Sequence, residues 1–160
     1  MHKPVRRYPR TSIALLLIVL AWLHGCGAPP EQPATVLSAN VVATGDVNSS
    51  GEELGRPVVV RLYELKSAGA FTSADFFSLY EKEAETLGAD LLGREEVSVA
   101  PGQFQHIEKR VAPEAAYLGV LVAFRDIDQS QWRTFNYMKP DVTNTFTVKV
   151  GANSVSVAGQ

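Results

Sequence analysis

The sequence has no apolar run long enough for a transmembrane helix. The uncharged run at residues 13–23 has eleven residues, whereas a helix needs ~20 to cross a bilayer core. It follows a cluster of basic residues, and the two together are typical of a secretory signal peptide. The sequence therefore predicts an exported protein whose residues 1–25 form a cleaved leader.

Cysteine is almost absent: Cys26 stands alone, so no disulfide can form within the chain. Its context, Leu23-His24-Gly25-Cys26, resembles a bacterial lipobox, although His24 is atypical at its position. In such a site the cysteine is acylated and becomes the first mature residue. Several acyl chains bind a bilayer much more tightly than one, so this lipid would keep the protein on its membrane. Gly27 follows, and the absence of aspartate there favours the outer membrane.

Catalytic motifs are missing from the part that follows the leader. Its only histidine is His106, so neither a cysteine–histidine pair nor a two-histidine zinc site can be built from one chain. No HExxH motif, Gly-x-Ser-x-Gly elbow or phosphate-binding loop occurs. Asp126 and Asp128 lack the further ligands of a calcium loop and are expected to shape a turn. We therefore expect no enzyme, no metal and no cofactor beyond the covalent lipid.

Composition predicts one tethered, acidic domain. Residues 26–34 contain three prolines, which favour an extended tether of roughly 25 Å at ~3.1 Å per residue. Residues 35–160 have the usual size of a single domain. Four of the 15 basic residues lie in the leader and all 17 acids follow it, so the exported chain has a formal charge of −6. Nucleic acid and anionic lipid surfaces are poor partners for that sign.

Alternation of apolar and polar residues predicts strands through most of the domain. It is cleanest where Phe146, Val148 and Val150 share one face, and a turn at 151–153 followed by renewed alternation predicts a hairpin. Two runs, 57–65 and 117–124, are apolar at nearly every residue, as in strands that are covered on both faces, and we expect them to be central. Shorter strand candidates are 36–43, 94–99, 104–111 and 132–137.

One segment has helical periodicity, over about 73–87. A capping-box pattern at 72–75 precedes it, Gly88 is placed to end it, and its apolar residues are Phe76, Phe77, Tyr80, Ala84 and Leu87. We expect the aromatic residues in this stripe to pack in the core. Seven or eight strands with one inserted helix predict a mainly β protein, a two-sheet β-sandwich, because an α/β fold would alternate strands with helices.

Several segments of the sequence together resemble one protein family. The segments PVVVRLYEL (57–65), FTSADFFSLY (71–80) and LGADLL (87–92) are similar, in order and spacing, to type VI secretion lipoproteins of the TssJ/VasD (SciN-like) family. The similarity continues to about residue 157. It implies a transthyretin-like β-sandwich with an added helix, anchored by lipid in the outer membrane and acting as a scaffold.

The resemblance also implies a partner, the periplasmic C-terminal region of the inner-membrane protein TssM, within a complex that includes TssL. In the family the loop between the first two strands contacts this partner. The matching stretch, 44–56, has thirteen residues, well above the usual length of a hairpin loop. Its candidate contacts are Asp46, Val47, Asn48, Glu52, Glu53 and Leu54.

Two other functions stay open at this point. A periplasmic ligand-binding or chaperone-like lipoprotein could use a sandwich to hold a small molecule or a strand of another chain, and a deep pocket would favour it. A lipid-anchored hydrolase would need an acid, a base and a nucleophile in one cleft, and the sequence offers few residues to build them. The long loop could also be a solvent-exposed connection without a partner.

Overall fold

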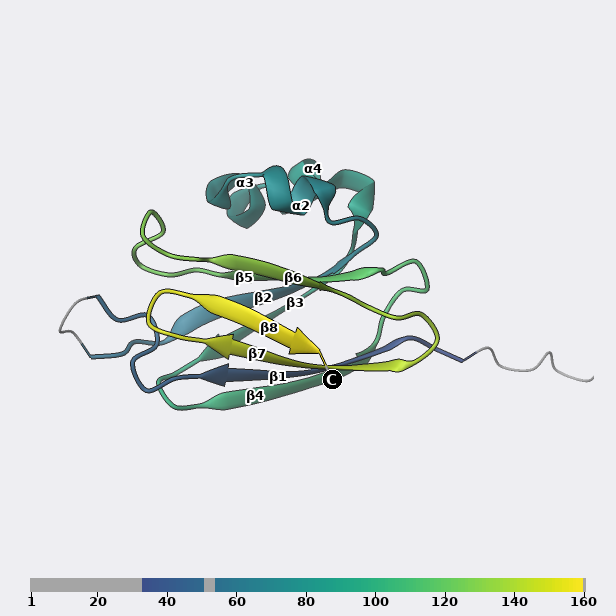
Figure 1. Cartoon of the computed structure of the whole chain (residues 1–160). Coiled ribbons are helices and arrows are strands. Elements are labelled where there is room, and N and C mark those ends of the chain that lie inside the picture. Colours follow the sequence, from purple (N-terminus) through teal and green to yellow (C-terminus); the bar gives the residue numbers. More distant parts are fainter. Residues whose placement is uncertain (1–32, 51–53, 160) are drawn as a thin grey trace, which may run out of the picture. The chain divides into compact units, whose positions relative to one another are not determined.

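Two four-stranded sheets form the domain in this computed structural model, which describes residues 33–50 and 54–159. The strands are β1 Val36–Ala43, β2 Val58–Leu65, β3 Leu91–Val99, β4 Phe104–Arg110, β5 Tyr117–Val122, β6 Arg133–Tyr137, β7 Thr143–Val150 and β8 Val155–Gly159. One sheet has the order β4-β1-β7-β8 and the other β3-β2-β5-β6 (Figure 1). Within the first sheet β1 and β7 are parallel, whereas the other neighbouring strands are antiparallel. The predicted two-sheet β-sandwich is confirmed.

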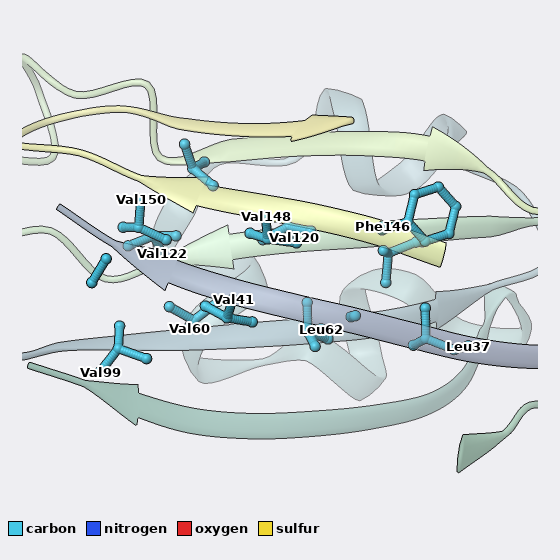
Figure 2. Close-up of a cluster of buried hydrophobic side chains, with 14 of the residues drawn as sticks. Leu37, Val41, Val60, Leu62, Val99, Val120, Val122, Phe146, Val148 and Val150 are labelled. Atoms are coloured by element: carbon cyan, nitrogen blue, oxygen red, sulfur yellow. The ribbon is translucent and has the colours of Figure 1, made fainter. Parts of the chain in front are cut away.

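The main core lies between the two sheets and is built from alternate residues of each strand. Val41 and Val148 of the first sheet belong to one buried cluster with Val60 and Val120 of the second (Figure 2). All four side chains are fully buried. Because successive residues of a strand point to opposite faces, this cluster explains the alternation seen near the end of the sequence.

The outer face of the second sheet is covered by three short helices, α2 Gly69–Ser73, α3 Phe76–Glu81 and α4 Glu83–Leu87 (Figure 1). A second buried cluster joins them to the sheet, with Tyr63 and Leu65 from β2, Leu121 from β5, and Phe71, Phe76, Leu79 and Leu87 from the helices. We call this sheet the covered sheet, and β4-β1-β7-β8 the open sheet. β2 and β5 are the central strands of the covered sheet, as their nearly continuous apolar runs predicted.

The prediction of a single helix over 73–87 is wrong. Ala74 is extended and separates α2 from α3, and Lys82, with φ −131°, separates α3 from α4. The capping residue is Asp75, whose side chain accepts a hydrogen bond from the Ser78 backbone N–H at 2.9 Å, so Thr72 does not cap the helix. Apolar spacing marked the buried face but carried no information on these breaks. The predicted end at Gly88 is confirmed, since Gly88 is the C-cap of α4.

The connections at one end of the sandwich come from four places in the sequence. β1 leads from Val36, where the chain enters the domain, to the loop 44–57, and at ~3.3 Å per residue its eight residues span roughly 26 Å. The β3–β4 turn, the β5–β6 loop and the β7–β8 turn reach the same end, which we call the far end (Figure 1). The long loop therefore lies opposite the point where the chain enters. Within the described part of the chain, every helix is too short or too polar to cross a bilayer.

Candidate partner-binding site

The base of the loop at 44–57 is built into the core of the sandwich. Val47 is fully buried and belongs to the main hydrophobic cluster. The backbone N–H of Val47 donates to the Thr44 carbonyl at 3.2 Å, and the Arg56 N–H donates to the Val47 carbonyl at 2.8 Å. The two ends of the loop approach each other at Gly45 and Gly55. A Cβ on Gly55 would lie 2.4 Å from the Gly45 carbonyl oxygen, so only glycine fits there. The loop therefore has a fixed base.

Asn48 joins this base to two neighbouring connections. Its side-chain amide donates to the Pro57 carbonyl at 3.2 Å and its Oδ1 accepts from the Arg125 N–H of the β5–β6 loop at 2.9 Å. Its own N–H donates to the Gly151 carbonyl of the β7–β8 turn at 3.3 Å. Asn48 has φ +54°, a left-handed conformation that asparagine adopts more readily than most residues. Since its side chain is buried and hydrogen-bonded, Asn48 holds the far end together.

The structure divides the six predicted contact residues into three groups. Val47 and Asn48 are buried, so they are not available as surface contacts and act instead as supports of the loop. Asp46 is exposed, and Leu54 is 88% exposed. Glu52 and Glu53 lie outside the described residues. The exposed residues of the loop stay predicted contacts.

Next to this loop, Phe77 of α3 projects from the surface with 61% of its side chain exposed. Its neighbour Phe76 is buried and packs against Tyr80 and Trp132, with ring centroids 5.3 and 5.4 Å away. Two open hollows of about 460 Å³ border Phe77, and both are also lined by Ile127 and Asp128 of the β5–β6 loop. The helical spacing predicted that Phe77 packs in the core with the rest of the aromatic stripe, and this prediction is wrong. Two adjacent phenylalanines cannot both face the sheet from one helix, so their adjacency in the sequence already indicated that one of the two rings is exposed.

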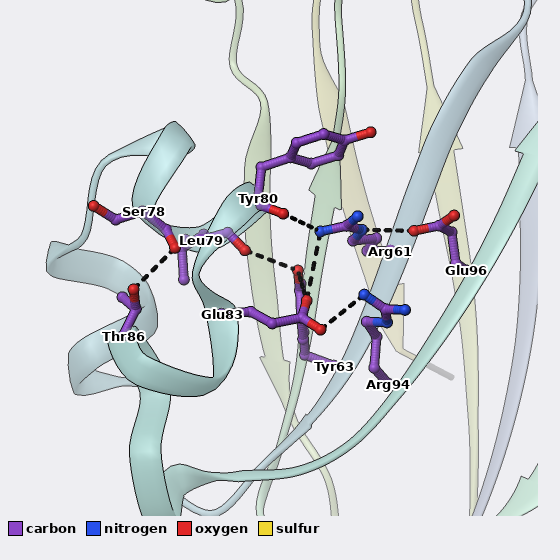
Figure 3. Close-up of polar contacts among 9 residues, drawn as sticks. All are labelled: Arg61, Tyr63, Ser78, Leu79, Tyr80, Glu83, Thr86, Arg94 and Glu96. Carbon is purple, nitrogen blue, oxygen red and sulfur yellow. Dashed lines mark hydrogen bonds and ion pairs between the residues drawn. The ribbon is translucent and has the colours of Figure 1, made fainter.

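A polar network fixes the helices that carry Phe77 to the covered sheet (Figure 3). Arg61 of β2 donates to the Tyr80 carbonyl and to Glu96 of β3, each at 2.7 Å, and its guanidinium lies 4.0 Å from the centre of the Tyr80 ring. Glu83 of α4 accepts from Arg94 at 2.7 Å and from the Tyr63 hydroxyl at 3.0 Å. Burial raises the pKa of Tyr63 to about 12. The network links β2 and β3 of the covered sheet to α3 and α4, so these two helices form a fixed part of the surface.

The remaining candidate residues of the described part of the chain do not come together in a catalytic or metal-binding site. His106 is exposed on β4, where its Nδ1 lies 2.9 Å from Asn40 Oδ1 and its Nε2 lies 3.8 Å from Glu108. Asp126 and Asp128 are exposed in the β5–β6 loop, in the turn that the sequence predicted. No group of three or more metal-binding side chains occurs in residues 33–50 and 54–159. Cys26, the predicted lipid site, lies outside the described residues.

The domain belongs to the class of two-sheet β-sandwiches, with helices that cover one sheet and loops that are hydrogen-bonded to one another at one end. Comparison with protein families agrees with this class and makes it specific. The profile of the family described as type VI secretion lipoprotein, VasD, EvfM, TssJ matches residues 35–153. The chain therefore belongs to the type VI secretion lipoproteins, and the resemblance stated from its sequence is confirmed.

Solved structures have the same fold. The T6SS lipoprotein TssJ1 from Pseudomonas aeruginosa is 30% identical, with a TM-score of 0.76, over 80% of this chain and 98% of TssJ1. A chain from a structure described as a type VI membrane complex is 26% identical, with a TM-score of 0.66 over 77% and 97% of the two chains. Another, from a structure described as the TssM C-terminal domain from EAEC, is 24% identical, with a TM-score of 0.63 over 77% and 97%; at that identity the likeness concerns the fold alone. No curated protein sequence matches the chain.

Proposed function

We propose that this chain is an outer-membrane lipoprotein that binds the periplasmic C-terminal region of TssM and so fixes the type VI secretion membrane complex, which includes TssL, to the outer membrane. Residues 1–25 would be the cleaved leader, Cys26 the lipid-bearing residue, residues 26–34 the tether and residues 35–160 the binding domain. The role is that of a scaffold without substrate, cofactor or catalysis.

Membership of the lipoprotein family is the observation that carries this proposal. A place in the type VI membrane complex is supported by a solved structure of like fold, 26% identical, which is described as the type VI membrane complex. The position of the loop agrees with it. A domain tethered through its N-terminus would keep the start of β1 toward its membrane, so a partner that comes from the inner membrane would meet the far end first.

The test is a calorimetric titration of the full-length lipoprotein, purified with its lipid in detergent, with the periplasmic C-terminal fragment of TssM from the same genome. We expect a dissociation constant of about 1 μM or lower. In the loop variant, residues 49–54 are replaced by glycine and serine at equal length. Replacement should begin at residue 49, since Val47 and Asn48 support the fold and their loss would confuse unfolding with lost binding.

A matched control changes exposed residues near the start of β1, where no partner is proposed. Lys139→Ser with Val142→Ser alters two exposed residues of the β6–β7 connection and should leave the affinity unchanged. Loss of binding in the loop variant alone, with unchanged thermal unfolding, would support the proposal. If the unaltered protein gives no heat with TssM and no complex in gel filtration, the TssM assignment fails and a ligand-binding role becomes the better hypothesis.

A further inference from the structure

Phe77 is an exposed aromatic ring held on a fixed support. Phe76 beneath it is 8% exposed and packs edge-on against the partly buried Trp132. Arg133, which follows Trp132, donates to the carbonyls of Phe71 and Ala74 and so holds α2 and the start of α3 to β6. Aromatic side chains are enriched at contact sites between proteins, where a rigid support lowers the cost of ordering them.

The groove beside Phe77 has carboxylates on its rim. One hollow lies between Ser50 of the long loop, Phe77 and residues 125–128, which include Arg125, and the other lies between Phe77, Asp75, Asp128 and Arg133. Three carboxylates and two guanidinium groups therefore line the groove. Asp75, Asp126 and Asp128 are all exposed. A flat aromatic face beside carboxylates suits a cationic side chain, because the ring attracts the cation through its π-system and a carboxylate pairs with its charge.

The groove is also continuous with the proposed contact loop. Ser50 belongs to that loop and lines the hollow, and Asn48, two residues earlier, binds the Arg125 N–H at the start of the β5–β6 segment. A partner seated on the exposed part of the loop would therefore reach Phe77 without crossing to another side of the domain.

We propose that this groove binds an arginine or lysine side chain of the same partner, stacked on Phe77 and paired with Asp126 or Asp128. The inference rests on the proposed function and deepens it, since it extends the contact surface from the β1–β2 loop across the β5–β6 loop to α3. The acidic charge of the exported chain agrees with a cationic partner surface.

The test repeats the titration with Phe77→Ala, Phe77→Leu, Phe77→Tyr and the double variant Asp126→Asn with Asp128→Asn, each in full-length lipoprotein in detergent. The control is Tyr137→Ala, because Tyr137 is 54% exposed but lies at the end of β6, at the opposite end of the sandwich from the contact loop. Phe77→Ala should weaken binding about tenfold, as expected for an aromatic contact of this kind. Phe77→Leu should weaken it nearly as much, since it keeps apolar area but no ring, and Phe77→Tyr should restore it.

The double aspartate variant should weaken binding at low salt and reduce its dependence on salt, because charge pairs at the rim of an interface are screened. If the loop variant loses binding but the Phe77 and aspartate variants bind TssM within about twofold of the unaltered protein, the groove inference is overturned and the proposed function stands. If Phe77→Leu binds normally while Phe77→Ala does not, the occupant is apolar and the cationic side chain is ruled out. Absence of binding by the unaltered protein would overturn both.

Discussion

The two sheets of this sandwich use the same backbone geometry but bury different amounts of their surface. In the open sheet, β7 alternates between buried residues such as Val148 and partly exposed ones such as Thr147. In the covered sheet, β5 has five consecutive buried residues, from Leu118 to Val122. The difference arises from the helices inserted between β2 and β3, which turn the outer face of one sheet into a second core. An insertion on one sheet thus changes the sequence pattern of strands that are distant in the chain.

Gly119 of β5 shows how closely the inserted helices approach the covered sheet. A Cβ at Gly119 would lie 2.8 Å from the Leu65 side chain and 3.2 Å from the ring of Phe71. A side chain larger than hydrogen would therefore press on the Leu65 side chain and on the ring of Phe71, and both would have to shift. The open sheet has no such requirement on its outer face, where the side chains meet no second layer in the described part of the chain.

The largest effect on the free energy of unfolding should come from removing a buried ring between the helices and the covered sheet. Phe71→Ala should lower the free energy of unfolding by about 3–5 kcal/mol, because it removes a fully buried ring and leaves a cavity between α2 and β5. Urea denaturation followed by circular dichroism would measure it. A loss below about 1 kcal/mol would mean that the helices are only loosely attached to the sheet.

Breaking the polar network on the same face should have the next largest effect on the free energy of unfolding. Arg61→Met should cost about 2 kcal/mol, since it keeps the apolar stem but leaves the Tyr80 carbonyl and Glu96 without this donor. Glu83 would keep its bond from Arg94. The same denaturation experiment tests this, and Arg61→Lys is the matched control, since it restores the charge without the fork of donors. If Arg61→Met is as stable as the unaltered protein, packing alone holds the helices.

Tyr63 makes the stability of the covered face depend on alkaline pH. Burial raises its pKa to about 12 in the folded chain, against about 10 when unfolded, so between these values only the unfolded chain releases the proton. Its contribution is therefore complete below pH 10 and is lost as the pH rises through about 12. The unaltered protein should lose up to about 2 kcal/mol more than Tyr63→Phe over this range. Parallel stability curves for the two proteins would contradict the assignment.

Much of the fold could be predicted from the sequence because burial leaves a pattern in it. The bounds of β1 were predicted without error, and the nearly continuous apolar runs identified β2 and β5 as central strands. The helical segment was predicted less well, since Phe76, Leu79 and Leu87 do bury one face while Ala74 and Lys82 break the helix at points that apolar spacing does not mark.

The candidate site could be predicted only as a segment. The family resemblance pointed to residues 44–56, and the length of the loop agreed with it. No pattern in a single loop reveals that Val47 turns inward or that Asn48 contacts Arg125, because these contacts depend on the neighbouring β5–β6 loop. Phe77 was missed for a related reason. Its exposure depends on where α3 begins, and that is set by the Asp75 cap.

The smallest effect on the free energy of unfolding should come from replacing an exposed phenylalanine of the open sheet by alanine. Phe104 pairs with Val42 at the edge of that sheet and is 70% exposed, so Phe104→Ala should change the free energy of unfolding by no more than about 0.5 kcal/mol. Compared with Phe71→Ala, it changes the same chemical group on the outer face of the other sheet. A cost above about 1 kcal/mol that grows with protein concentration would mean that a second copy covers the open face in solution, and the contrast between the two sheets would then hold for the monomer only.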